Sequence, residues 1–304
     1  MDLQDKIDRL KSVPDDLVSA MGKVENDAMR KVLGLIESLE TESGIILNNS
    51  FNLSLISAIE QELKGAIFSN SYYKSLANFS SEFQVQASLN NAYFASIIDD
   101  FVVLKDFTKV MEASRNSALS LLSEDAFSQA LIKPIQDSLL SSVIGGGSIT
   151  DTLKSIRQIV IGSNDVDGRL ISHVKRVAYD AFAIADRQYT QAVGNHHKFE
   201  WFQWFGGKVS DSRCFCIEHH GKYFHRKEIE GFGEGLGIGN CSVYSSKLLR
   251  NGWQGMNENT TKITIWSYAG GYFCKHSILP VSQFVVPKEV IQRNIDSGNY
   301  QEAA

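Results

Sequence analysis

The chain has 304 residues, about two domains' length, and 43% of them are hydrophobic and 21% charged. This globular composition excludes a disordered tail protein and a collagen-like fibre. Lys and Arg number 30 against 35 Asp and Glu, and the net charge of −5 gives no general attraction to nucleic acid or anionic membranes. No apolar run reaches the ~20 residues that span a bilayer, and the acidic N-terminus is unlike a signal peptide. We therefore expect a soluble intracellular protein.

The first 195 residues have the periodicity of amphipathic helices. Apolar residues recur at spacings of three and four, as in Val32, Leu35, Ile36 and Leu39, in Ile56, Ile59, Leu63 and Ile67, and in Ile171, Val174, Ala178, Ala181 and Ala185. Another apolar segment runs from Ile97 to Met111. Pro14 is followed by Asp15 and Asp16, which predicts a helix start just after the proline, because aspartate caps helix N-termini. None of these helices carries a cluster typical of a catalytic site.

Polar and glycine-rich pieces predict where the helices stop. Residues 48–50, 69–71 and 78–81 are rich in Ser and Asn and predict turns or caps. Residues 145–147 are three glycines, and Thr150 or Asp151 then begins a new helix.

The composition changes near residue 195. All four cysteines, all four tryptophans and six of the seven histidines follow that point. We therefore predict a mainly α fold with a small α+β C-terminal region. Its parts are a helical region over 1–147, connecting helices over 148–198, a compact Cys/His-rich unit over 199–286, and a short helix and tail over 287–304.

The compact unit has its own expected elements. The aromatic residues Phe199 and Trp201 alternate as in a strand that ends at glycines 206–207. Lys288 to Asn294 predicts a terminal helix ended by Gly298. The core is expected to form around four tryptophans, namely Trp201, Trp204, Trp253 and Trp266.

The cysteines and histidines of this unit indicate a structural zinc site. Thiolate and imidazole are the ligands that zinc prefers, in a tetrahedron of four. One pair, Cys214 and Cys216, and a second pair, Cys274 and His276, lie about sixty residues apart and would supply such a set. The alternate ligands are His219, His220 and Cys241. A metal would stabilise a small, loop-rich unit, since binding and folding are coupled.

Two other interpretations of these residues stay open. The cysteines could be reduced and partly buried while the histidines lie at the surface. Alternatively, Cys214 or Cys216 could form a disulfide with Cys274, although the lack of a secretion signal argues against it. A nucleophile and base pair such as Cys214 and His219 has no recognisable signature around it, so we predict no catalytic residues.

Two separated stretches, residues 211–224 and 270–281, resemble the minor capsid, or head-morphogenesis, proteins of tailed phages. The first stretch covers residues 211–216 and 220–224 and includes Asp211, Arg213 and Gly221-Lys222. The second, residues 270–281, is similar to the closing pattern G-G-x-x-C-[RK]-H-x-x-x-P-V. An alanine-containing helix over 177–187 precedes them, as in that family, and the likeness covers roughly residues 170 to 285. Many members have Cys-x-x-Cys where this chain has Cys214-x-Cys216.

The resemblance implies a structural, non-enzymatic virion protein that is assembled in the host cytoplasm. Its expected partners are the portal, the major capsid protein or a connector, in several copies, and without specific nucleic-acid binding or membrane contact. One alternative is an enzyme of the nuclease or transferase type packaged with the virion. Another is a zinc-stapled interaction module.

Overall fold

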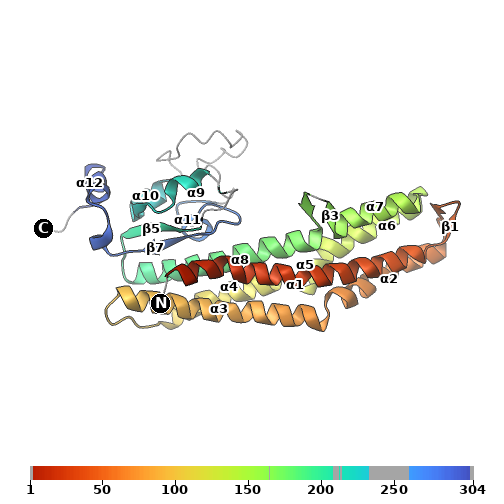
Figure 1. Ribbon diagram of the computed structural model, residues 1–304, viewed down its shortest axis with the longest axis horizontal. Helices are drawn as coiled ribbons and strands as arrows, with labels where there is room; N and C mark the ends of the chain where they lie inside the picture. The colour runs from red at the N-terminus through yellow and green to blue at the C-terminus, as the bar shows by residue number, and fades with distance from the viewer. Residues whose placement is uncertain (1–2, 164, 208–211, 213, 233–259, 302–304) are drawn as a thin grey trace. The chain divides into compact units, whose positions relative to one another are not determined.

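The computed structural model describes residues 3–163, 165–207, 212, 214–232 and 260–301 (Figure 1). Most of these residues are helical, and a few short strands form small sheets, which confirms the predicted fold class. No helix in the described ranges is long and apolar enough to cross a bilayer.

The elements up to residue 196 are almost all helices. In chain order they are α1 (Leu3–Glu37), β1 (Thr41–Glu42), β2 (Ile45–Ile46), α2 (Ser50–Ile67), α3 (Asn70–Ile97), α4 (Lys105–Leu121), α5 (Glu124–Phe127), the π-helix η1 (Ser128–Ile132), α6 (Lys133–Gly145), α7 (Ile149–Val160), β3 (Gly162–Ser163), β4 (Val166–Asp167) and α8 (Arg169–His196).

The C-terminal elements are shorter and mixed. They are β5 (Trp201–Gly206), α9 (Cys214–His219), β6 (Tyr223–His225), α10 (Arg226–Gly231), α11 (Ile265–Tyr268), β7 (His276–Pro280), the 3-10 helix η4 (Gln283–Val285) and α12 (Lys288–Asp296). The predicted strand begins at Trp201 rather than at Phe199, and the predicted terminal helix is α12, followed by Gly298 in the left-handed region.

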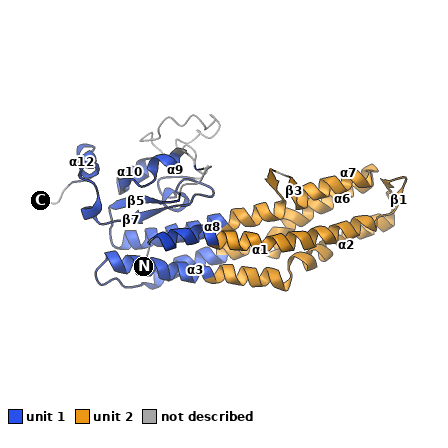
Figure 2. Cartoon of the chain, in the orientation of Figure 1, with its two compact units in different colours: residues 1–12, 82–116, 179–304 blue, residues 13–81, 117–178 orange. Residues whose placement is uncertain are grey.

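The chain divides into two compact units that are not contiguous in sequence (Figure 2). Unit 1 comprises residues 1–12, 82–116 and 179–304, and unit 2 comprises residues 13–81 and 117–178. This division differs from the predicted one, which cuts the chain into successive ranges. The difference arises because α1, α3, α4 and α8 each contribute residues to both units.

The first helix contradicts the predicted start after Pro14. Helix α1 begins at Leu3 and contains Pro14, so neither Asp15 nor Asp16 is its cap. An interior proline costs a helix about 3 kcal/mol. The apolar stripe continues on both sides of it, with Leu10 and Val13 before and Leu17 after, all buried. Burial along this stripe offsets the cost of the proline.

The predicted breaks were right except at one place. Asn49 caps α2, α3 begins at Asn70, and α6 ends at Gly145, with Gly146 in the left-handed conformation. The predicted turn at residues 78–81 is wrong, because α3 runs through it with Phe79 buried. Helix α7 begins one residue early, at Ile149, capped by Ser148.

In unit 2, the side chain of a buried asparagine, Asn52, joins the two ends of the β1–β2 hairpin. The Asn52 side chain accepts a hydrogen bond from the Glu40 N–H at 2.8 Å and donates to the carbonyls of Glu40 and Leu47 at 3.0 and 2.7 Å. Its amide is thereby satisfied on both sides, as burial requires. This one side chain fixes how the chain turns between α1 and α2.

Unit 1 contains a three-stranded antiparallel sheet in the order β6-β5-β7. Phe202 and Trp204 point to one face, because side chains alternate along a strand, and lie in an aromatic cluster with Trp266. Trp201 points the other way and packs on His225 and Tyr300 at ring distances of 5.1 and 5.2 Å. The tryptophans therefore do not form one cluster as predicted, and Trp253 lies outside the described residues.

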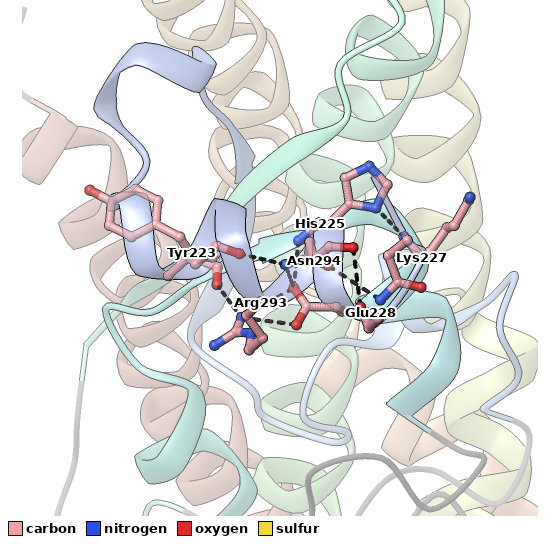
Figure 3. A network of polar contacts seen from close by, with 9 residues as sticks. Tyr223, His225, Lys227, Glu228, Arg293 and Asn294 are labelled. Atoms are coloured by element: carbon pink, nitrogen blue, oxygen red, sulfur yellow. Dashed lines mark hydrogen bonds and ion pairs between the residues drawn. The ribbon is translucent and has the colours of Figure 1, made fainter. Parts of the chain in front are cut away.

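The C-terminal helix α12 is fastened to the rest of unit 1 through Glu228, as Figure 3 shows. The Glu228 carboxylate accepts a hydrogen bond from the His225 N–H at 2.8 Å, which makes a capping box for α10. Arg293 and Asn294 of α12 also donate to it, at 2.9 and 2.8 Å. Arg293 reaches the Tyr223 carbonyl as well, at 3.3 Å. This network is a structural fastening between α10, β6 and α12.

A second carboxylate, Asp186 of α8, is the polar centre of unit 1. It has no exposed surface and accepts hydrogen bonds from Lys6, Gln86 and Ser277 at 3.0, 2.9 and 2.7 Å. Burial by itself raises the pKa of Asp186, but the Lys6 charge and the three donors outweigh it, and the pKa ends below its usual value. Asp186 is therefore a buried anion that joins α1, α3 and β7 to α8.

Replacing this carboxylate tests its role. Asp186→Asn leaves the Lys6 ammonium buried without a charged partner, and we expect a loss of about 3–5 kcal/mol in the free energy of unfolding at pH 7. Because the pKa of Asp186 is lowered on folding, the difference from wild type should shrink as the pH falls below 3.8. Urea unfolding at several pH values measures both. The exposed pair Lys133–Asp137 supplies the control, since Asp137→Asn should cost less than about 1 kcal/mol.

Glu25 in unit 2 should give the stability of the protein the opposite pH dependence. Its partial burial, together with the nearby Asp167 charge, raises the pKa of Glu25 from 4.5 to about 7. A raised carboxyl pKa contributes stability that is present below pH 4.5 and is lost as the pH rises through about 7. Glu25→Gln should therefore melt at a higher temperature than wild type at pH 8, with a smaller gap at pH 5. The exposed Glu37 on the same helix is the control, and a Glu37→Gln protein with the same pH profile would contradict the interpretation.

Candidate metal centre

Three buried side chains with metal-binding atoms converge in unit 1. Cys216 lies on α9, Cys274 precedes β7, and His276 is the first residue of β7. Their ligand atoms all lie within 4.8 Å of one another. The two sulfurs are 3.8 Å apart, and the Cys274 Sγ lies 3.9 Å from the His276 Nδ1. Each residue is at most 4% exposed.

Strand pairing sets the position of Cys274 and His276. β7 runs antiparallel to β5, with His276 opposite Gly206. A side chain at 206 would not fit, because a Cβ there would lie 2.4 Å from the Lys275 carbonyl oxygen. The close approach of the two strands at this point therefore needs glycine. Cys274 lies two residues before His276, and the ligand atoms of both lie within 4.8 Å of each other and of the Cys216 sulfur.

Gly270 completes the wall of the centre. A Cβ on Gly270 would lie 2.3 Å from the Cys216 sulfur and 3.1 Å from the Cys274 sulfur. Its own N–H points to the Cys274 Sγ at 3.3 Å. A backbone N–H aimed at a sulfur stabilises the thiolate form, which is the form that binds metals.

The surroundings of Cys274 favour the thiolate. A hydrogen bond with Cys216 is the largest effect, burial opposes it, and His276 and the Arg187 charge act in the same direction as Cys216. Together they hold the pKa of Cys274 well below its usual value. The residue is thus prepared to ligate a cation or to act as an anionic hydrogen-bond acceptor.

His276 is oriented by a second histidine. The His220 Nδ1 lies 3.3 Å from the His276 Nε2, while the His276 Nδ1 faces Cys274. The His276 ring is therefore held between a histidine nitrogen on one side and the Cys274 sulfur on the other. Metal-ligating histidines are commonly oriented in this way, by a partner on the other ring nitrogen.

His219, an alternate ligand in the sequence, has a different environment. Its ring stacks on Phe215 at 4.0 Å, and its Nδ1 lies 2.7 Å from the Phe215 carbonyl oxygen. Burial lowers the pKa of His219 to about 4, so the ring is neutral at pH 7. It belongs to the aromatic core rather than to the group of three.

The structure brings together Cys216, Cys274 and His276 out of the four predicted ligands. Cys214 begins α9, but its side chain lies outside the described residues, as does Cys241. A disulfide between Cys216 and Cys274 is absent, since the S–S bond is ~2.05 Å long and the sulfurs are 3.8 Å apart. The interpretation with surface histidines is wrong for His219 and His276, because both are buried.

Sequence reasoning missed two residues of the centre, Arg187 and Gly270. Arg187 is 3% exposed and donates from one nitrogen to the carbonyls of Cys274 and His276, at 3.1 and 2.9 Å. The available signal was a charged pair, Asp186 and Arg187, directly after the small-residue stripe that ends at Ala185. A stripe of that kind faces a packed neighbour, so charges beside it are candidates for buried partners.

Two thiols and an imidazole at these distances could hold a metal ion. No known protein family, curated protein or solved structure matches this chain. Such a set has the soft ligand types that suit zinc and related transition metals. Its burial in the aromatic cluster of the sheet leaves it closed within the described residues.

A methyl group at Gly270 tests the geometry. Gly270→Ala places a carbon within 2.3 Å of the Cys216 sulfur, so we expect the thiols to separate and the domain to lose stability by about 1–3 kcal/mol. Gly207→Ala is the matched control, because a Cβ there meets nothing within 4 Å. Thermal unfolding of both variants measures the effect, and equal melting temperatures would contradict the described contact.

Proposed function

We propose that this protein is a structural component of a tailed-phage virion, a minor capsid or head-morphogenesis protein. The observation that carries the proposal is that the two stretches behind the resemblance meet at one buried centre. Cys216 comes from the first stretch, and Gly270, Cys274 and His276 come from the second. Motifs that are separate in sequence and joined in space behave as parts of one structural unit.

The centre is best suited to a structural zinc. Catalytic zinc sites keep one position open for water or substrate, whereas structural sites are closed. Here the three ligand side chains are almost fully buried and lie against an aromatic core. We therefore propose that zinc staples the sheet and α9 together, and that the protein has no enzymatic activity. Cys214 remains the predicted fourth ligand from the sequence.

The proposed role is assembly through protein–protein contacts. The partners would be the portal, the major capsid protein or a connector, with several copies of this chain per virion. A net charge of −5 gives no reason to expect specific nucleic-acid binding. Assembly would take place in the host cytoplasm, and the mature protein would reside in the virion.

Metal content tests the centre. We expect about one zinc per chain, by inductively coupled plasma mass spectrometry, in the full-length protein purified without oxygen. Cys274→Ser should lose that zinc, because a hydroxyl is a much poorer ligand than a thiolate. His196→Ala, an exposed histidine outside the centre, should retain it.

Virion association tests the assembly role separately. Mass spectrometry of purified particles should find the protein, and particles produced without it should have defective heads. Zinc without virion association would favour the interaction module and overturn the assembly role. Virion association without zinc would overturn the metal centre alone.

A further inference from the structure

Arg187 of α8 is a buried cation beside the Cys/His centre. Its side chain is 3% exposed, and its Nη1 donates to the carbonyl oxygens of Cys274 and His276. Those are the two residues of the predicted Cys-x-His ligand pair. One guanidinium nitrogen thus contacts the main chain on both sides of Lys275.

No carboxylate among the described residues forms an ion pair with Arg187. Its neighbour Asp186 is occupied by Lys6, Gln86 and Ser277. A buried charge without compensation costs several kcal/mol, so the surroundings of Arg187 must supply negative charge. The carbonyl dipoles supply part of it.

Two consecutive residues of α8, Asp186 and Arg187, both contact the segment that carries Cys274 and His276. Asp186 binds the hydroxyl of Ser277 at 2.7 Å, and Arg187 binds the carbonyls of residues 274 and 276. The start of β7 is therefore fixed to a rigid helix rather than held only by its own sheet. A ligand pair fixed in this way loses little conformational entropy when it binds a metal.

We infer that Arg187 is a positioning residue of the metal centre, which clamps Cys274 and His276 at ligating distance through their carbonyl oxygens. This inference rests on the proposed zinc centre. It assigns to a residue of the helical region a role in metal affinity, although Arg187 does not itself touch the metal.

Two substitutions in the full-length protein test the clamp. Arg187→Met removes both hydrogen bonds, and we expect zinc affinity, measured by competition with a chromogenic chelator, to fall about 10- to 100-fold. Arg187→Lys keeps a charged donor but has a different reach and no planar guanidinium, so its zinc affinity should lie between that of wild type and that of Arg187→Met. The absorption bands of the cobalt(II)-loaded protein should shift in both variants, because the ligand geometry changes.

Phe182→Leu is the matched control for stability. Phe182 lies on the same helix, is fully buried and packs against Phe83 at 5.2 Å, and it is not a member of the cluster that holds Cys216 and Cys274. It should lower the melting temperature and leave zinc affinity and the cobalt spectrum unchanged. Arg187 variants that lower only the melting temperature would show a merely structural role and overturn the inference.

The outcomes also separate this inference from the function on which it rests. Zinc-free wild-type protein would overturn the centre and the role of Arg187 together. Zinc-loaded wild type with unchanged affinity in Arg187→Met would overturn the role of Arg187 alone. If Arg187→Met does not fold, Arg187→Lys decides, and affinity equal to wild type in that variant overturns the inference.

Discussion

The arrangement of unit 1 depends on one requirement, that the buried carboxylate of Asp186 keeps its donors. An ionised carboxylate without exposed surface is tolerated only when charge and hydrogen bonds replace its lost hydration. Here those donors come from three separate stretches of chain, through Lys6, Gln86 and Ser277. Helices α1 and α3 and the start of β7 must therefore sit against α8 at defined positions. Apolar packing alone would permit many more registers between the same helices.

The helices were predictable from sequence, because burying one face of a helix places apolar residues three and four positions apart. That spacing is visible in a short stretch of sequence. Even there, the period could not show that α1 passes through Pro14, since the compensating burial comes from residues distant in sequence. The metal candidates were predictable by side-chain type, because few residues suit zinc. Which three converge depended on the pairing of β5 with β7, which no local pattern encodes. Asp186 and Arg187 were missed because a charged pair on a helix usually marks a solvated edge, and their partners lie up to 180 residues away.

Helix α8 carries two buried charged residues, and one of them contacts the candidate metal ligands. Asp186 carries a buried negative charge matched by Lys6, and the next residue carries a buried positive charge that faces two main-chain carbonyls and a thiolate-favouring cysteine. The low local polarity strengthens each of these interactions and makes each one costly to break. Within unit 1, the helical scaffold and the small Cys/His part are therefore joined by these contacts. The scaffold supplies the groups that orient the ligands, which suits a protein whose proposed work is to hold a fixed shape.

The composition of unit 1 from both ends of the chain has a consequence for synthesis. During translation, Lys6 leaves the ribosome 180 residues before Asp186 does, and Ser277 follows 91 residues later. Unit 2, made of residues 13–81 and 117–178, is complete before Asp186 or Ser277 is synthesised. Unit 2 can fold while the chain grows, whereas the start of α1 cannot form its ion pair until Asp186 has been synthesised. Closing contacts across so long a stretch is slow, so we expect unit 1 to form after unit 2.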